Sequence, residues 1–139
     1  MMMIDAVSFQ TSALAFLIAF LAAGVFTILF KVIYQFATPY NERRLIREGN
    51  VAAAITLGAA LLGYILPLAS ALAHTVSLAE FAAWAVLAGV IQIVAFTVVR
   101  QIVMRDLSDR VERGELAAAI YMASISIGVG LLNAACMTS

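Results

Sequence analysis

The chain has 139 residues, of which 65% are hydrophobic and 12% are charged, and its mean hydropathy is +1.06. This composition is too apolar for a water-soluble domain of this size, so it predicts a membrane protein surrounded by lipid. The formal net charge of zero gives no basic surplus for nucleic acid, and the single cysteine excludes an internal disulfide and a cysteine-based metal cluster.

Apolar windows long enough to cross a bilayer occur four times in the sequence. A span of the hydrocarbon core takes about 20 apolar residues. The windows that meet this length are about residues 12–36, 51–73, 78–99 and 116–137. The sequence therefore predicts an all-α membrane protein with four transmembrane helices in a single domain, residues 1–139.

The second half of the chain repeats the first half at an offset of 65 positions without a gap. The offset places Gly49, Ala52, Ala53, Ala54, Ile55, Gly63 and Ala69 on Gly114, Ala117, Ala118, Ala119, Ile120, Gly128 and Ala134. Repeat one covers about residues 11–74 and repeat two about residues 76–139. Because a unit of two spans preserves orientation, the units are predicted to be parallel tandem repeats, a plan that some transporters use.

A short polar stretch follows the first span. Thr38 is a candidate N-cap with Pro39 at the first helical position, and Gly49 suits a C-terminal cap. Asn41 and Glu42 belong to the polar and charged residues that alternate with apolar ones between these caps. The pattern predicts a short helix in the cytoplasmic interface, with a solvated loop as the alternative, and the second repeat has the same arrangement before Gly114.

The second span contains Pro67, whose ring excludes the normal hydrogen bond to the carbonyl of Gly63 and predicts a kink. Lipid cannot satisfy the freed backbone group, so Tyr64, Ser70 or a neighbouring helix is expected to do so. The matching position in the second repeat is Leu132. This asymmetry makes the kink a candidate functional element, and the alternative is that Pro67 only shapes the bundle.

The third span has one face that should point into the bundle. Gln92 on this face is expected to form a hydrogen bond across helices, either as a packing contact or as a contact to a solute. Together with Asn133 in the fourth span, it is the polar side chain most able to reach the kink. The residues spaced to share the face are Ala85, Gly89, Gln92 and Phe96.

Small residues separated by four positions predict close helix packing in the second and fourth spans. The equivalent pairs are Ala59 with Gly63 and Ser124 with Gly128. The fourth span has a further small and polar side formed by Ser126, Gly130 and Asn133. A helix with small residues on both sides needs two partners, so we expect a homo-oligomer that assembles through this second side.

The charges predict the topology. All eight basic residues lie around two of the connections, whereas the connection at residues 74–77 and both tails have none. By the positive-inside rule the two basic connections are cytoplasmic and both termini are outside. Ser77 and Glu80 form a capping box that begins the third span at the outer surface.

The chain resembles the YjfL-type family of small inner-membrane proteins, whose members have no assigned biochemical function. The resemblance rests on Thr38–Pro39–Tyr40–Asn41–Glu42, Leu45–Ile46, Asn50, Leu61–Leu62–Gly63–Tyr64, Pro67–Leu68, Phe81, Trp84 and Asn133–Ala134–Ala135–Cys136–Met137–Thr138. It implies a multi-pass protein of the bacterial inner membrane. It brings no catalytic, cofactor or metal residue to this sequence.

The sequence lacks a cluster of His, Asp and Glu, a nucleophile beside a base and a glycine-rich phosphate loop, so we expect no enzyme and no cofactor. The first hypothesis is a small non-catalytic oligomeric membrane subunit, with an unidentified membrane or cytoplasmic protein as a further partner. The alternative is a channel or transporter for a small solute or ion. Coupled transport usually needs an ionisable residue deep inside a span, and the predicted spans carry theirs, Lys31 and Glu80, only near their ends.

Overall fold

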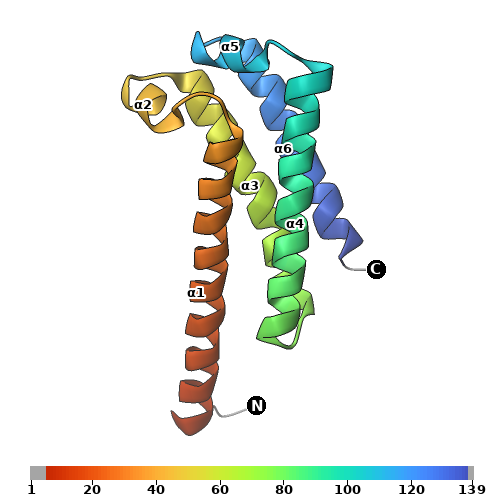
Figure 1. The fold of residues 1–139 in the computed structure, drawn as a ribbon. Helices are drawn as coiled ribbons and strands as arrows, with labels where there is room; N and C mark the ends of the chain where they lie inside the picture. Colours follow the sequence, from red (N-terminus) through yellow and green to blue (C-terminus); the bar gives the residue numbers. More distant parts are fainter. Residues whose placement is uncertain (1–5, 138–139) are drawn as a thin grey trace.

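The structure, a computed structural model, describes residues 6–137, and this range is helical and contains no strand. The elements in chain order are α1 (Ala6–Ala37), α2 (Glu42–Arg47), α3 (Val51–His74), α4 (Leu78–Val98), the π-helical turn η1 (Val99–Val103), α5 (Leu107–Glu112) and α6 (Leu116–Cys136) (Figure 1). Four helices, with η1 continuing α4, are long and apolar enough to cross a membrane. The chain ends, including Thr138 and Ser139, lie outside the described residues.

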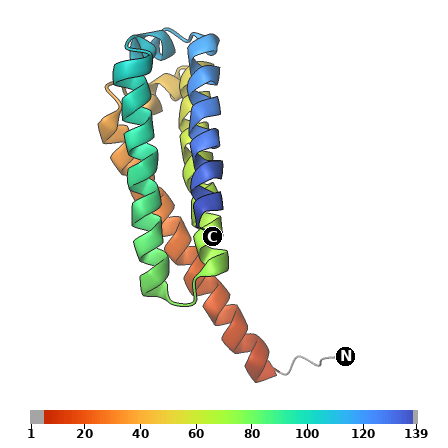
Figure 2. The ribbon, with the colours of Figure 1, turned by 90° about the vertical axis from the view of Figure 1, so that its right-hand side faces the viewer.

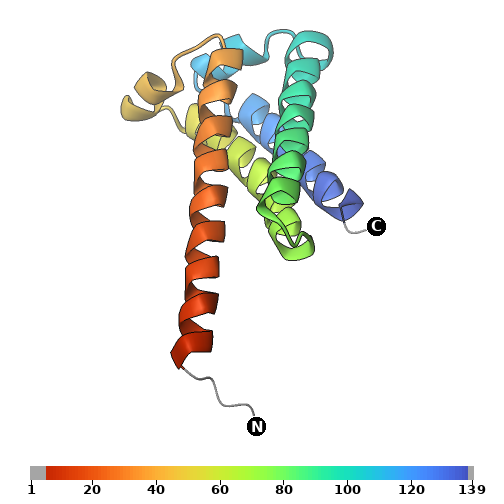
Figure 3. The same ribbon diagram turned by 60° about the horizontal axis from the view of Figure 1, so that its bottom comes forward.

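The long helices form a bundle in which α3 and α6 make the most extensive contact and α4 packs against both. Helix α1 contacts this bundle through its C-terminal half, from about Ala22 onward, and its N-terminal part extends away from the bundle (Figures 2 and 3). Its 32 residues correspond to about 48 Å at 1.5 Å per residue, which exceeds the hydrocarbon thickness. Only Phe30 and Tyr34 of α1 are buried, so most of its apolar surface is left to other molecules.

The short helices α2 and α5 lie together at one end of the bundle, and the described ends of α1 and α6 lie away from them (Figure 1). Asn41 is the N-cap of α2, since its side-chain oxygen accepts a hydrogen bond from the Arg44 backbone N–H at 3.1 Å. The prediction that Thr38 is this cap is wrong. The N–H and hydroxyl of Thr38 donate to carbonyls in the last turn of α1, and Pro39 directs the residue before it out of helical backbone.

Glycines end both short helices. Gly49 has φ of 89° and Gly114 has φ of 81°, in the left-handed region where a side chain is strained. This confirms the predicted C-terminal cap at Gly49. Ser77 is confirmed as the N-cap of α4, because its hydroxyl accepts from the Glu80 N–H at 3.1 Å.

Asn50 joins α3 to α5 at the end of the bundle that holds the short helices. Its side-chain oxygen caps α3 by accepting from the Ala53 N–H at 2.9 Å. Its amide group donates to the carbonyls of Val111 and Glu112, both at 3.1 Å, in the last turn of α5. One side chain therefore satisfies orphan backbone groups of two helices.

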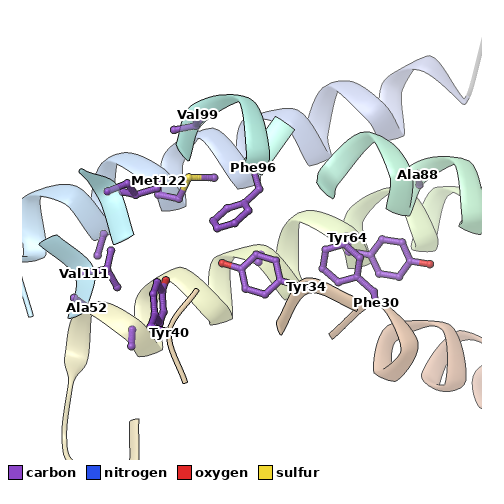
Figure 4. Close-up of a cluster of buried hydrophobic side chains, with 14 of the residues drawn as sticks. Phe30, Tyr34, Tyr40, Ala52, Tyr64, Ala88, Phe96, Val99, Val111 and Met122 are labelled. Atoms are coloured by element: carbon purple, nitrogen blue, oxygen red, sulfur yellow. The ribbon is translucent and has the colours of Figure 1, made fainter. Parts of the chain in front are cut away.

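A row of aromatic side chains fills the space between α1, α3 and α4 (Figure 4). The rings of Phe30 and Tyr64 stack with centroids 4.4 Å apart, and the Tyr34 ring packs on Phe96 at 4.8 Å. The expected inward face of α4 is confirmed, since three of its members are buried and Gly89 is half-buried. The buried members are Ala85, Gln92 and Phe96.

Candidate functional site

Helices α3 and α6 approach each other most closely at two glycines. A Cβ atom on Gly130 would lie 2.8 Å from the Cα of Gly63 and closer still to its carbonyl oxygen. A Cβ atom on Gly63 would lie 2.6 Å from Nε2 of Gln92 and would also meet the carbonyl oxygen of Ser126. Because real Cβ atoms do not approach other atoms so closely, the contact requires glycine at both positions.

The sequence predicted that Ser124 and Gly128 pack within the chain and that the opposite side of α6 mediates assembly, and the structure shows the opposite side packed within the chain. Ser126, Gly130 and Asn133 are buried, and the first two pack on α3 within the same chain. Ser124 is exposed, and a Cβ atom on Gly128 would meet nothing within 4 Å. The contact lies two residues beyond the position expected from the offset, and two residues turn a helix by about 200°, so nearly the opposite side packs.

The proline in α3 acts on this same contact. Pro67 is fully buried within the continuous helix α3, and its ring leaves the Gly63 carbonyl without its normal donor. That carbonyl oxygen lies where Gly130 would carry its Cβ atom, so a Cα–H group of Gly130 points at it. Such a contact is a weak hydrogen bond, and it gives the freed carbonyl a neighbour inside the membrane-spanning bundle.

The predicted polar side chains do not gather on the freed carbonyl. The Gln92 amide donates to the Ser126 carbonyl at 3.2 Å, which confirms its expected bond across helices. Each of the others also donates to a backbone carbonyl of a neighbouring helix, so together they tie α3, α4 and α6 to one another. These bonds are Tyr64 Oη to Ala85 at 3.0 Å, Ser70 Oγ to Ala134 at 3.1 Å and Asn133 Nδ2 to Ala88 at 3.4 Å.

The remaining residues that were predicted to pack between helices lie in different parts of the bundle. Ala59 is buried beside the crossing of α3 and α6. Gly89 lies beside the aromatic row, where an added Cβ atom would meet the Tyr64 ring at 3.4 Å. The side-chain oxygen of Gln92 is buried and has no hydrogen-bond partner among the described residues.

A second cluster of polar groups lies at the end of the bundle that holds α2. Glu42 is 2% exposed, and neither of its carboxylate oxygens has a hydrogen-bond partner in the described part of the chain. The hydroxyl of Tyr34, which is 1% exposed, also lacks a partner within residues 6–137. Thr38 and Tyr40 are buried nearby, and Figure 4 shows the Tyr34 hydroxyl on the side of its ring that faces Tyr40.

The electrostatics of this cluster follow from burial. Burial raises the pKa of Glu42 to about 7, and the Thr38 side chain and the charge of Lys31 act against this rise. Burial and the neighbouring Glu42 charge also raise the pKa of Tyr40. A hollow of about 300 Å³ lies beside Glu42. Its lining residues are Gln35, Tyr40, Asn41, Glu42 and Arg43.

The sequence assigned Glu42 to a short interfacial helix or a solvated loop and did not identify its side chain as buried. The only available signal was its spacing, since Glu42 precedes Leu45 by three positions and the two residues share one helix face. Leu45 is 5% exposed, so that face of α2 packs on the bundle. The carboxylate is carried inward with the leucine.

Comparison with known proteins identifies the family. Residues 8–137 match the family described as Domain of Unknown Function (DUF350). The chain belongs to this family. It is 39% identical over 127 residues to the UPF0719 inner membrane proteins YjfL of Escherichia coli strain K12 and of Escherichia coli O157:H7, covering 91% of this chain and 96% of each relative. No solved structure matches.

These matches confirm the resemblance that the sequence motifs carried. With four apolar helices and relatives named as inner membrane proteins, the DUF350 chain is a membrane protein. The family description assigns no biochemical role. A role therefore has to be argued from the residues themselves.

Proposed function

We propose that this DUF350 chain is a small, non-catalytic subunit of the bacterial inner membrane that assembles with further copies of itself through the outward side of α6. The observation that supports this is a row of residues at alternating spacings of four and three, all exposed except Gly128, which is partly buried. The row, here called the α6 seam, consists of Ala117, Tyr121, Ser124, Gly128 and Leu131.

The α6 seam has the properties of a contact between membrane helices. Gly128 is open at its centre, so the backbone of a second helix can come close. The Ser124 hydroxyl donates to the Ile120 carbonyl of its own helix at 2.9 Å, so covering it leaves no unpaired donor. A second copy can present the same surface in return, as a two-fold symmetric contact requires.

The proposed topology places the end with α2 and α5 in the cytoplasm and both termini in the periplasm. It is supported by the eight basic residues, which all belong to α2, α5 and the adjoining helix ends and connections. We further propose that α1–α2–α3 and α4–α5–α6 are parallel repeats with α2 and α5 in the membrane interface. The support is that Glu42 and Leu107, where these short helices begin, are 65 positions apart.

The experiment that tests assembly is the mass of the purified protein in mild detergent and in nanodiscs. Gly128→Leu places a large side chain in the α6 seam and should shift the population to monomers. Gly58→Leu is the matched control, because Gly58 is also an open helical glycine but lies on α3. A monomeric wild-type protein, or a Gly128→Leu variant that assembles as the wild type does, would contradict the proposal.

The second candidate function is transport of a small solute or ion. Two observations favour it, namely the buried Glu42 carboxylate without a partner and the buried Gln92 oxygen without one among the described residues. Unpaired polar groups inside an apolar bundle are costly, and they often mark solute or ion pathways. A flux assay with purified protein in proteoliposomes tests this candidate, and fluxes equal to those of empty liposomes would exclude the tested ions.

A further inference from the structure

The Glu42 carboxylate is a buried charged group without a hydrogen-bond partner in the described chain, so it is the strongest candidate for a ligand site. An isolated carboxylate cannot be buried without a partner, because removing it from water costs several kcal/mol. Both oxygens of Glu42 and the hydroxyl of Tyr34 lack a partner among residues 6–137. The two side chains are neighbours, and both are almost completely buried.

The fixed charges around Glu42 do not neutralise it by direct contact. Lys31 of α1 acts on Glu42 through its charge and Arg43 of α2 lines the hollow beside it, yet the described chain contains no ion pair to Glu42. The charges of Arg100 in η1 and Glu112 in α5 act on the neighbouring Tyr40 hydroxyl. The negative charge is therefore left for a mobile ligand to balance.

The donor atoms define the chemistry of that ligand. They are carboxylate and hydroxyl oxygens, the donors that hard cations prefer. The Thr38 hydroxyl uses its proton on the Gln35 carbonyl at 3.0 Å, so its lone pairs remain available. One carboxylate balances one positive charge, and no three His, Cys, Asp or Glu side chains gather in the described part of the chain to hold a divalent ion. The hollow of about 300 Å³ beside Glu42 gives access from the surface.

We propose that Glu42, with the hydroxyls of Tyr34 and Thr38, binds one small inorganic monovalent cation, Na⁺ or K⁺, in exchange for a proton. In this exchange the O–H bond of the protonated carboxyl breaks, the proton passes to bulk solvent and the cation takes its place at the carboxylate oxygens. The site goes beyond the proposed assembly and holds whether or not the protein transports the ion.

The experiment measures proton release when cation is added. Purified full-length protein in phosphatidylcholine nanodiscs, weakly buffered at pH 7 with a pH-sensitive dye, receives NaCl or KCl, with choline chloride at equal ionic strength as the reference. Since the carboxyl has a pKa of about 7, about half of the chains hold the proton, so saturating cation should release about half a proton per chain. Choline should release no protons, because it is too large for the site and its methyl groups keep the oxygens away from its charged nitrogen.

Matched variants assign the released proton. Glu42→Gln imitates the protonated side chain, so it should fold and release nothing. Glu48→Gln removes an exposed carboxylate at the end of the same helix and should release as much as the wild type. Tyr34→Phe deletes one oxygen donor and should raise the cation concentration for half-release several-fold.

The proposal is overturned if choline releases as much as Na⁺ and K⁺, if the Glu42→Gln variant still releases protons, or if only Mg²⁺ produces release. Unchanged half-release in Tyr34→Phe overturns the assignment of that hydroxyl as a ligand. Circular dichroism and a monodisperse elution profile establish that each variant is folded before it is titrated.

Discussion

The close contact between α3 and α6 predicts different effects of alanine at three glycines, which all lie inside apolar helices but have different neighbours. Gly58, Gly128 and Gly130 are all interior positions of membrane helices. Alanine at Gly58 or Gly128 would meet nothing within 4 Å, whereas alanine at Gly130 would meet the backbone of Gly63. The substitution Gly130→Ala should therefore be the destabilising member of the set.

The magnitudes follow from two opposing terms. Replacing glycine by alanine inside a helix stabilises it by roughly 0.5–1 kcal/mol, because the unfolded chain loses freedom. At Gly130 the added methyl group would also lie 2.8 Å from a Cα atom that belongs to a packed helix and cannot rotate away. Overpacking of this kind costs about 1–3 kcal/mol, so Gly130→Ala should be less stable than Gly128→Ala by about that amount.

The assay is equilibrium unfolding in mixed micelles with increasing denaturing detergent, followed by circular dichroism and by the fluorescence of Trp84. Low protein concentration keeps assembly through the α6 seam from contributing to the signal of Gly128→Ala, and Gly58→Ala gives a reference outside that seam. Equal stability of Gly130→Ala and Gly128→Ala would refute the intramolecular glycine contact.

Three further predictions concern the end of the bundle with α2 and α5. Asn50→Ala should lower the free energy of unfolding by about 1–3 kcal/mol through loss of the α3 cap and two donated bonds, and Asn50→Asp, which keeps the cap, should lie between. Because folding raises the pKa of Glu42 from 4.5 to about 7, the unfolded chain releases the Glu42 proton at a lower pH than the folded chain does. In choline salts the unfolding free energy should then fall by on the order of 3 kcal/mol between these pH values, and Glu42→Gln should remove the dependence. In a background without Cys136, a cysteine at Glu48 should react only from the cytoplasmic side and one at Val76, which is 99% exposed, only from the periplasmic side.

The spans, the glycine caps and the Ser77 cap could be predicted because they depend on local sequence, whereas the N-cap of α2 is Asn41 and not the predicted Thr38. Apolar length specified the four long helices, and the glycine after each short helix specified where it ends. The side of α6 that packs could not be predicted in this way. Ser124–Gly128 and Ser126–Gly130 are equally small pairs, and the choice between them depends on how α3 presents Gly63 to its neighbour.

The Glu42 cluster was missed for a related reason. Burial of a charged residue depends on the element that covers it, and here Glu42 is 2% exposed and interacts with Thr38 and with Lys31 of α1. The π-helical turn η1, which brings Arg100 near Tyr40, has no sequence signal of its own. Both features arise from tertiary packing that periodicity does not report.

The link between Pro67 and Gly130 leads to a prediction of non-additive stability. Pro67→Ala restores an N–H group that can bond the Gly63 carbonyl within α3, and this bond draws the oxygen toward the axis of its own helix. The oxygen then moves away from Gly130, so a methyl group there meets less resistance. The cost of Gly130→Ala should fall by at least about 0.5 kcal/mol in the Pro67→Ala background, which is the coupling expected for residues in contact.

The double-mutant cycle needs a control in which Pro67→Ala is combined with a glycine substitution that does not touch α3. Gly128→Ala serves, because Gly128 has open space around it and should add to Pro67→Ala without coupling. If Gly130→Ala is also additive with Pro67→Ala, then the proline does not set the direction of the Gly63 carbonyl. The close approach of α3 and α6 would then depend on the two glycines alone, and the role of Pro67 would lie in its other contacts in the buried core.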